Sequence, residues 1–152
     1  MTVPNFANTR TTAINAPAAR VHALVNDFRA WTRWSPWEGL DPDLKRTYSG
    51  PEAGLGSAYA WDGNKKAGTG TMEIISSTPE RIEIALEFLK PFKASNIATF
   101  SFAESSGTTK VDWTMSGQRN VVFAVLGRLF FDNAIAKDFD KGLASLKAAA
   151  EA

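Results

Sequence analysis

The alternation of apolar and polar side chains in the second half of the chain constrains its fold most. In residues 81–88 every second side chain is apolar, and the residues between them are an arginine, two glutamates and an alanine. A period of two is typical of a β-strand that buries one face and exposes the other to water. Residues 98–102 and 111–116 repeat the pattern, and Ser105-Ser106-Gly107 between them is a hairpin signal. These segments predict neighbouring antiparallel strands with a common apolar face.

Further strands are predicted earlier in the chain. Residues 59–61 and 70–74 each place their larger apolar side chains on one face, and Asp62-Gly63-Asn64 supplies turn chemistry between them. Residues 10–14 and 45–48 are expected to add one strand each. The sequence thus predicts an antiparallel sheet of about seven strands, most of them joined by short turns.

Two helical segments frame the predicted sheet. The first has apolar residues at i, i+3, i+4 and i+7 from Val21 to Phe28, with Asn15 as the expected N-cap and Pro17 near the first turn. The second spans about residues 121–150, which is roughly 45 Å at 1.5 Å per residue. Its first half is apolar nearly all round, and its second half narrows to an apolar stripe of Ile135, Phe139, Leu143 and Leu146. We expect this helix to lie on the concave side of a curved sheet.

Length and composition narrow the function classes. The 152 residues suit a single domain, residues 1–152, and a formal charge of +1 is too even for a protein that holds nucleic acid by bulk electrostatics. The chain has no cysteine, and its one histidine, His22, is predicted to be a solvated surface residue. No segment approaches the roughly 20 apolar residues of a membrane span. No secretory signal is seen, so we expect a soluble, cytoplasmic domain without metal or cofactor.

The predicted inner face of the sheet carries no ionisable side chain between residues 68 and 117. General acid–base catalysis needs a titratable group held against the substrate, and this face offers none. Its polar atoms are the Tyr59 hydroxyl and the indole N–H groups of Trp61 and Trp113. Such a surface suits a flat or oily molecule fixed by one or two hydrogen bonds. The alternative is that these aromatic side chains simply fill the core.

The segment 31–38 is the densest aromatic patch of the chain. Trp31, Trp34 and Trp37 are spaced by three residues, and Glu38 follows. One interpretation makes the segment the lid or mouth of a pocket, with Glu38 as its only acid. Another makes it a hydrophobic plug against the edge of the sheet. A third makes it an exposed surface that docks on another protein or on a second copy of the chain.

Several segments, taken with the order of the elements, carry a resemblance to a known superfamily. They are residues 14–17, Asp27-Phe28, the tryptophans of 31–37, Tyr59-Ala60-Trp61, Gly63-Asn64, residues 68–72 and residues 137–143. Residues 9–150 resemble the helix-grip fold of the START/SRPBCC superfamily, and most closely its bacterial polyketide cyclase/dehydrase-like branch. The resemblance implies an α+β fold in which a curved antiparallel sheet wraps around a long C-terminal helix, with two short helices after the first strand. In that superfamily the long helix closes a cavity lined by the inner face of the sheet.

Carried over to this chain, the resemblance places the ligand-binding residues on the inner face, on the long helix and in the tryptophan segment. They are Trp34, Trp37, Tyr59, Trp61, Met72, Phe88, Phe100, Phe102, Trp113, Met115, Phe123, Leu126, Phe130 and Ile135. The first functional hypothesis is the binding of a small hydrophobic or aromatic ligand, such as a lipid, a quinone or a polyketide-like metabolite. The second is a cyclase- or dehydratase-type enzyme that acts mainly by confining its substrate, with Tyr59 as weak acid and Glu38 as base. A homodimer is a further option.

Overall fold

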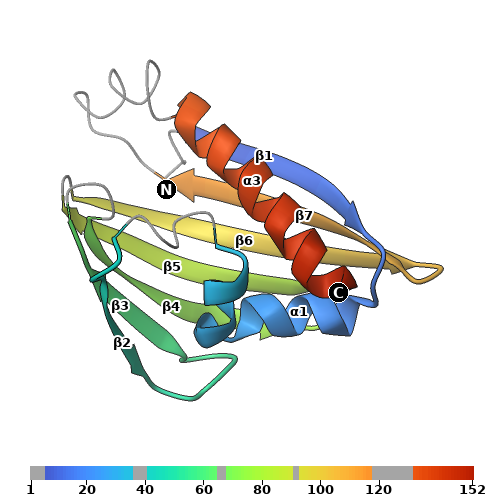
Figure 1. Ribbon diagram of the computed structural model, residues 1–152, viewed down its shortest axis with the longest axis horizontal. Coiled ribbons are helices and arrows are strands. Elements are labelled where there is room, and N and C mark those ends of the chain that lie inside the picture. Colours follow the sequence, from blue (N-terminus) through green and yellow to red (C-terminus); the bar gives the residue numbers. More distant parts are fainter. Residues whose placement is uncertain (1–5, 36–40, 65–67, 91–92, 118–131) are drawn as a thin grey trace, which may run out of the picture.

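The computed structural model describes residues 6–35, 41–64, 68–90, 93–117 and 132–152, in which seven strands form one antiparallel sheet (Figure 1). The strands are β1 (Phe6–Ile14), β2 (Lys45–Ser49), β3 (Ala58–Asp62), β4 (Thr69–Thr78), β5 (Arg81–Lys90), β6 (Ala94–Ser105) and β7 (Thr108–Gly117). Their order across the sheet is β1-β7-β6-β5-β4-β3-β2. Strands β2 to β7 therefore form a meander, and β1 closes the far edge by pairing with β7. The predicted sheet of about seven strands is confirmed.

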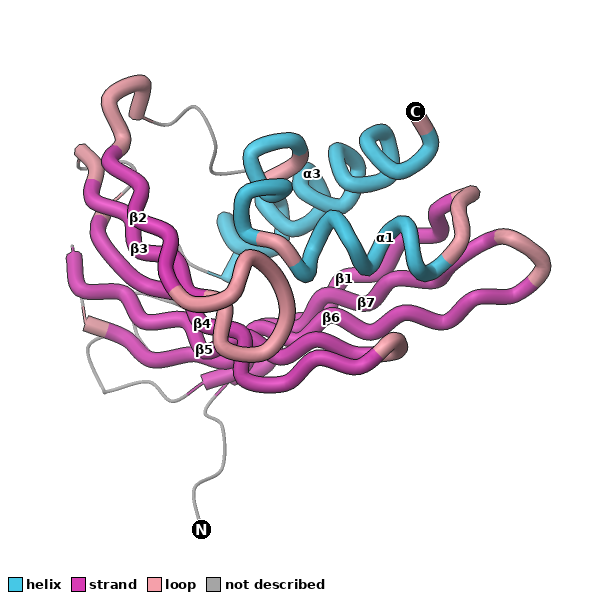
Figure 2. Tube along the Cα trace, turned by 90° about the horizontal axis from the view of Figure 1, so that it is seen from below, coloured by secondary structure: helices cyan, strands magenta, loops and turns pink. Residues whose placement is uncertain are grey.

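The described helices all lie on one side of this sheet, which curves around them (Figure 2). They are α1 (Ala18–Asn26), the 3-10 helix η1 (Phe28–Arg33) and α3 (Asp132–Glu151). The predicted α+β helix-grip fold, with two short helices after the first strand and a C-terminal helix across the sheet, is confirmed. Residues 121–131, the predicted first half of the long helix, lie outside the described residues. None of the described helices is long and apolar enough to cross a membrane.

The alternation read from the sequence appears as alternate burial. Ile82 and Ile84 of β5 are fully buried against the helices, whereas Arg81 and Glu87 are exposed. The predicted β6–β7 hairpin turns through Ser106 and Gly107, which have φ of 53° and 80°. Two consecutive residues with positive φ give the type I′ geometry that matches the twist of the flanking strands.

The expected N-cap of α1 is wrong. Pro17 occupies the cap position in an extended conformation, and the Asn15 Oδ1 instead accepts a hydrogen bond from the Thr108 hydroxyl at 3.1 Å. The first helical N–H, that of Ala18, donates to the Glu104 Oε1 at 2.6 Å. A carboxylate is well placed there, because the N-terminus of a helix carries partial positive charge. The capping group therefore comes from β6 and not from the local sequence.

Polar contacts join α3 to β1 and to the residue that follows β1. Arg10 of β1 forms an ion pair with Asp140 at 3.1 Å, and the Lys147 ammonium donates to the Ala13 carbonyl at 3.1 Å. Glu151 accepts hydrogen bonds from Lys147 and, at 2.8 Å, from the Asn15 N–H. Both hydrogen bonds lower the pKa of the Glu151 carboxyl from its ordinary value of 4.5, and the one from Lys147 has the larger effect.

We expect the Glu151→Gln variant to be less stable than the unsubstituted protein at neutral pH, and equally stable in acid. Because folding lowers this pKa, the carboxylate stabilises the fold above about pH 4.5 and loses that effect as the pH falls through its lowered value. The measurement is the melting temperature as a function of pH, with the exposed loop variant Glu52→Gln as control. A Glu151→Gln deficit that stays constant down to the most acidic pH would contradict the assignment.

Candidate ligand-binding site

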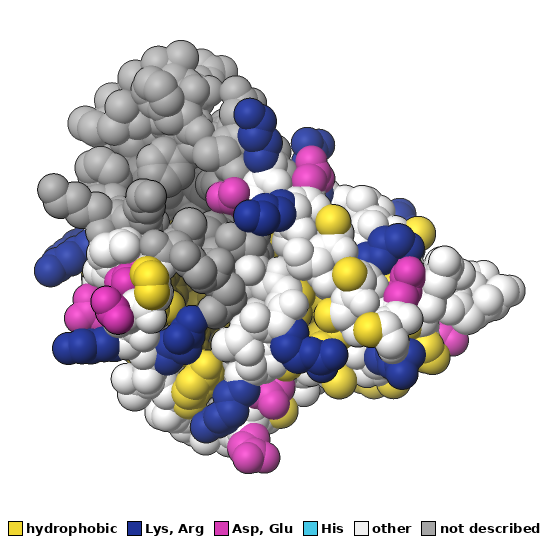
Figure 3. All heavy atoms as spheres, in the orientation of Figure 1, with side chains coloured by type: hydrophobic (Ala, Val, Ile, Leu, Met, Phe, Trp, Pro, Cys, Tyr) yellow, Lys and Arg dark blue, Asp and Glu magenta, His cyan; other side chains and the backbone are white. Residues whose placement is uncertain are grey.

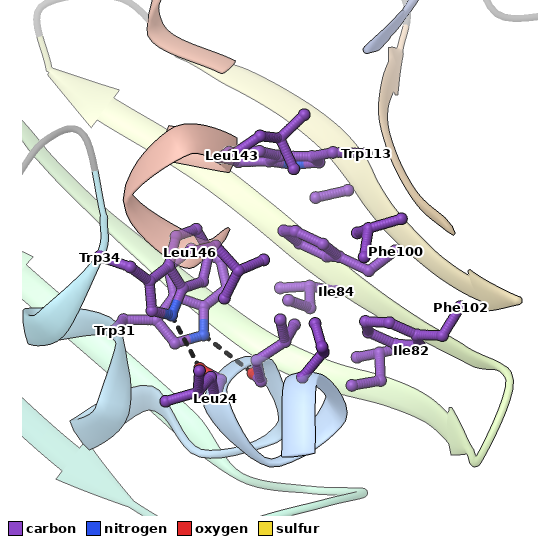
Figure 4. Packing of buried hydrophobic residues seen from close by; sticks show 14 of the residues in the cluster. Leu24, Trp31, Trp34, Ile82, Ile84, Phe100, Phe102, Trp113, Leu143 and Leu146 are labelled. Carbon is purple, nitrogen blue, oxygen red and sulfur yellow. Dashed lines mark hydrogen bonds between the residues drawn. The ribbon is translucent and has the colours of Figure 1, made fainter. Parts of the chain in front are cut away.

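A stack of aromatic rings fills the space between α3 and the middle of the sheet. The Trp113 ring of β7 lies parallel to the Phe139 ring of α3, with centroids 4.0 Å apart and planes 7° apart. On its other side Trp113 stacks on Phe100 of β6 at 4.8 Å. All three side chains are almost completely buried, and Leu143 and Leu146 of α3 complete this packing (Figure 4). The middle of α3 is therefore packed on the sheet through the contact between the Phe139 and Trp113 rings.

Trp31 and Trp34 belong to the same packed region. Trp31 packs edge-on against Phe100, and Trp34 against Phe100 and Trp113. Their indole N–H groups donate to the Val25 and Leu24 carbonyls, each at 2.8 Å (Figure 4). These carbonyls lie in the last turn of α1, where a helix leaves oxygens without an intrahelical partner. Both indoles thus join α1 to the core.

The burial of these two tryptophans decides between the interpretations of segment 31–38. Trp31 is 5 % and Trp34 2 % exposed, so the hypothesis of an exposed docking surface is wrong for both residues. Their burial agrees with the plug interpretation, except that they pack on Phe100 of β6 and Trp113 of β7 and not on an edge strand. Trp37 and Glu38 lie outside the described residues.

A second aromatic group lies toward β2 and β3, and it is only half-buried. Tyr48, Tyr59 and Trp61 stack in a row, with centroids 5.2 Å apart for the first pair and 6.0 Å for the second. Phe88 meets the edge of Trp61 at 5.9 Å, and the Arg29 guanidinium lies 4.5 Å from the Tyr48 ring centroid. We call Tyr48, Tyr59, Trp61 and Phe88 the aromatic row. These rings pack against the core on one side and retain accessible surface on the other.

Gly70 of β4 makes room for the Trp61 ring. The two residues are directly opposite on neighbouring strands, and a Cβ atom at Gly70 would lie 2.5 Å from the indole. The same Cβ would lie 2.5 Å from the Glu87 carbonyl oxygen of β5. Only glycine lets the indole lie against the backbone of β4, so Gly70 sets the position of Trp61.

The register of the sheet aligns the aromatic row with a buried amide. Directly opposite residues of antiparallel strands share a face. Tyr48, Tyr59, Met72, Leu86 and Asn96 are opposite one another in turn from β2 to β6, so they form one line across the inner face. Asn96 is 7 % exposed, and its Oδ1 has no hydrogen-bond partner among the described residues.

Sequence reasoning missed Asn96, although the signal for it was present. Its position has the same parity as Ala98, Phe100 and Phe102, whose alternation predicts the inner face of β6. The predicted absence of ionisable side chains on this face between residues 68 and 117 is wrong at Glu104, which has the parity of Phe100 and Phe102 and accepts the Ala18 N–H of α1 at the end of β6. Arginines share this face only at the edges of the described sheet, where Arg10 is opposite Trp113 and Arg46 is opposite Trp61.

The structure separates the predicted ligand-binding residues by burial. Five are in the packed core, namely Trp34, Phe100, Phe102, Trp113 and Met115. Four others lie together: Tyr59, Trp61 and Phe88 are half-buried, and Met72, opposite Tyr59, is buried. Phe123, Leu126 and Phe130 lie outside the described residues, as Trp37 does. Ile135 lies in α3, and its side chain is outside the described part.

His22 is half-buried and not a solvated surface residue. Its Nε2 lies 2.9 Å from the Thr78 carbonyl oxygen, and its ring meets the edge of Phe102 with centroids 5.5 Å apart. The sequence prediction failed because the apolar stripe of α1 does not show that β4 and β6 reach the flank of the helix. His22 therefore joins α1 to the sheet.

The charged surface has no dominant sign on the face that Figure 3 shows. There, described lysine and arginine side chains alternate with aspartate and glutamate and do not gather into one patch. Within the described part of the chain, no group of three or more His, Asp or Glu side chains could hold a metal ion. The described residues thus offer a mainly apolar and aromatic inner face that includes the Asn96 amide, with charged residues at its margins, and no cluster suited to a metal.

Comparison with known proteins identifies the family. Residues 6–151 match the family described as polyketide cyclase / dehydrase and lipid transport. No curated protein gives a match.

Solved structures share the fold at low sequence identity. A protein from Chromobacterium violaceum has a TM-score of 0.70 and 16% identity, covering 96% of this chain and 97% of that one. The dimeric Aha1 from Colwellia psychrerythraea has a TM-score of 0.65 and 16% identity, covering 96% of each chain. The di-domain ARO/CYC BexL from the BE-7585A biosynthetic pathway has a TM-score of 0.68 and 24% identity. The match covers 97% of this chain and 50% of the BexL chain.

These likenesses show the fold, and the family match extends over nearly the whole chain. The curved sheet around a C-terminal helix is also the architecture that the resemblance predicted. The chain belongs to the polyketide cyclase/dehydrase and lipid transport family of the START/SRPBCC superfamily.

Proposed function

We propose that this protein binds a small hydrophobic or aromatic ligand, such as a lipid, a quinone or a polyketide-like metabolite, between the curved sheet and the C-terminal helix. The observation that carries the proposal is the aromatic row on the inner face. Its rings stack on one another and stay half-buried, whereas the rings below α3 are closed off by Phe139. The family, whose description includes lipid transport, supports the same class of ligand.

The physical advantage of such a site is the removal of aromatic surface from water. Each square ångström of apolar surface covered contributes about 25 cal/mol, and an offset ring-to-ring contact adds about 0.5–1.5 kcal/mol. A planar ligand on Tyr59 and Trp61 obtains both contributions. Met72, opposite Tyr59, supplies a flexible thioether side chain that adapts to the shape of the ligand.

The buried core provides a rigid base for the proposed site. Phe28 of η1 lies between the two regions, because its ring is 6.0 Å from Tyr59 and 5.7 Å from Trp31. Trp34, Phe100, Phe102, Trp113 and Met115 then form the closed end of the interior in this proposal. Trp37, Phe123, Leu126, Phe130 and Ile135 remain proposed lining residues from the family resemblance.

The enzyme hypothesis has less support among the described residues. A cyclase that works by confinement would use the same apolar surface, with Tyr59 as its weak acid. Glu38, the proposed base, lies outside the described residues. Among the described residues, the carboxylate at an inner-face position of β6, Glu104, accepts the Ala18 N–H at the N-terminus of α1 and is therefore already used as a helix cap. Ligand binding is therefore the preferred function, and a homodimer like that of the Aha1 structure stays a prediction.

The Met72→Trp variant is expected to lower the affinity for an uncharged aromatic probe at least tenfold. Met72 is 9 % exposed and lies between Tyr59 and Leu86, so the larger indole occupies the space proposed for the ligand. The measurement is a fluorescence titration with N-phenyl-1-naphthylamine. A tenfold loss corresponds to about 1.4 kcal/mol of binding free energy.

The control is Ile75→Trp on the same strand. Ile75 is 41 % exposed, so the added ring lies outside the interior and the affinity is expected to stay unchanged. Thermal melting of both variants checks that the sheet is intact. If the probe binds the Met72→Trp variant as tightly as the Ile75→Trp variant, the ligand does not lie on the aromatic row.

A further inference from the structure

We propose that the Asn96 side chain selects ligands that carry a hydrogen-bond donor, such as a phenolic hydroxyl, on a flat apolar body. The inference rests on the proposed ligand-binding function and adds a specificity determinant to it. In the bound state the ligand hydroxyl donates a hydrogen bond to the Asn96 Oδ1.

The first argument is the position of Asn96. It lies on β6 directly opposite Leu86 of β5, which is buried on the inner face. Its neighbours Ser95 and Ile97 are more exposed, as the alternation of a strand requires. Two positions further along the same face is Ala98, and two beyond that is Phe100, both buried and apolar. Asn96 thus precedes three apolar residues on this face of β6, Ala98, Phe100 and Phe102, and the carboxylate at the far end of the same line, Glu104, accepts the Ala18 N–H of α1.

The second argument is the unpaired acceptor. Within the described part of the chain, the Oδ1 of Asn96 is buried without a hydrogen-bond partner, and only 7 % of the residue is accessible to solvent. A buried carbonyl oxygen without a donor lowers the stability of a fold, and such groups are rare in native proteins. Leucine or valine would satisfy the strand and the core equally well. A donor supplied by a ligand would remove the penalty.

The third argument is the length and composition of the line that Asn96 terminates. From Tyr59 on β3 to Asn96 on β6 there are three inter-strand spacings, which is roughly 14 Å along the sheet. Met72 and Leu86 lie between them, and both are apolar. A molecule of two or three fused rings that lies along Met72 and Leu86 stacks near Tyr59 at one end and reaches Asn96 at the other.

The chemistry of this surface favours a neutral donor over a charged group. Described cations lie at the Tyr48 end of the line, where Arg29 is over the Tyr48 ring and Arg46 is opposite Trp61. Asn96 itself is opposite the uncharged residues Leu86 and Gly117. An unpaired charge on a buried ligand would be strongly disfavoured. An amide oxygen accepts from a hydroxyl or an N–H group and offers nothing to an ether oxygen. The discriminating property is therefore the presence of a donor.

The test compares 2-naphthol with its methyl ether, 2-methoxynaphthalene, by isothermal titration calorimetry. The two probes share the ring system, and only the naphthol donates a hydrogen bond. The quantity measured is the affinity for 2-naphthol divided by the affinity for 2-methoxynaphthalene. A change in the general hydrophobicity of the site affects both affinities, so it does not change this ratio between variants. We expect this ratio to be about tenfold larger in the unsubstituted protein than in Asn96→Leu, with the affinity for the ether retained.

Two further variants complete the design. Ser95→Ala, at the exposed neighbouring position of β6, is expected to leave the ratio unchanged. Asn96→Ala, which introduces no added bulk, is expected to reduce the ratio as Asn96→Leu does. It keeps the test valid if leucine disturbs the packing. Thermal melting reports folding for each variant.

The outcomes separate this inference from the function on which it rests. If both probes bind and the ratio is the same in the unsubstituted protein and in both Asn96 variants, selection by Asn96 is wrong and ligand binding stands. If neither probe binds the unsubstituted protein at millimolar concentration, both the aromatic ligand class and the role of Asn96 are overturned.

Discussion

Replacing Trp113 by alanine is expected to lower the free energy of unfolding by about 3–5 kcal/mol. The indole lies between Phe139 and Phe100, and it is 1 % exposed. Its removal leaves a large cavity under α3, and it also removes contacts to Trp31 and Trp34. Neighbouring rings held by hydrogen bonds to α1 have little freedom to fill that space. The measurement is urea-induced unfolding followed by circular dichroism.

Trp61→Ala is the matched comparison, because it deletes the same side chain from the half-buried aromatic row. Here we expect a smaller loss, about 1–2 kcal/mol, since less apolar area is buried. The affinity for N-phenyl-1-naphthylamine should be lower in the Trp61→Ala variant and unchanged in the Trp113→Ala variant. The Trp113→Ala variant must be assayed below its melting transition. If instead Trp61→Ala is the more destabilising of the two, the division into closed core and open site is incorrect.

The strand pattern was predictable because it depends on short-range alternation. Residues 81–88 repeat with a period of two over eight positions, and Ser106 and Gly107 lie at a turn where such residues are common. The cap of α1 was not predictable in this way. Glu104, which accepts the Ala18 N–H, is 86 positions away in the chain, so local sequence rules pointed to Asn15 instead.

The candidate site was predictable as a face but not as a set of contacts. Parity puts Tyr59, Trp61, Phe100 and Trp113 on one side of the sheet, and the sequence treated them as one lining. In the structure Phe139 of α3 covers Trp113, whereas Tyr59 and Trp61 are half-buried. That crossing is a tertiary arrangement, and an apolar stripe on a helix does not specify which strand it meets. The unpaired state of the Asn96 oxygen depends on the same three-dimensional packing.

Gly70→Ala is expected to destabilise the protein by about 1–3 kcal/mol and to weaken ligand binding. The new methyl group would lie 2.5 Å from both the Glu87 carbonyl oxygen and the Trp61 indole. The carbonyl belongs to the β4–β5 pairing, which already shifts register between Thr69 and Gly70, and it has little freedom to move. The indole can move, but only by leaving the position from which it stacks on Tyr59. Thr71→Ala, at the next and exposed position, should change stability by no more than about 0.5 kcal/mol.

A double-mutant cycle separates the two clashes at Gly70. In a Trp61→Ala background the clash with the indole is gone and the clash with the backbone remains, so Gly70→Ala should be less destabilising there. A coupling free energy of about 0.5–2 kcal/mol is expected between the two positions. If the changes in unfolding free energy of the two substitutions are strictly additive, the indole does not lie against Gly70. The Trp61 ring would then not have the position that the proposed ligand site requires. Coupling together with a loss of probe affinity in Gly70→Ala would link the choice of glycine on β4 directly to the orientation of the aromatic row.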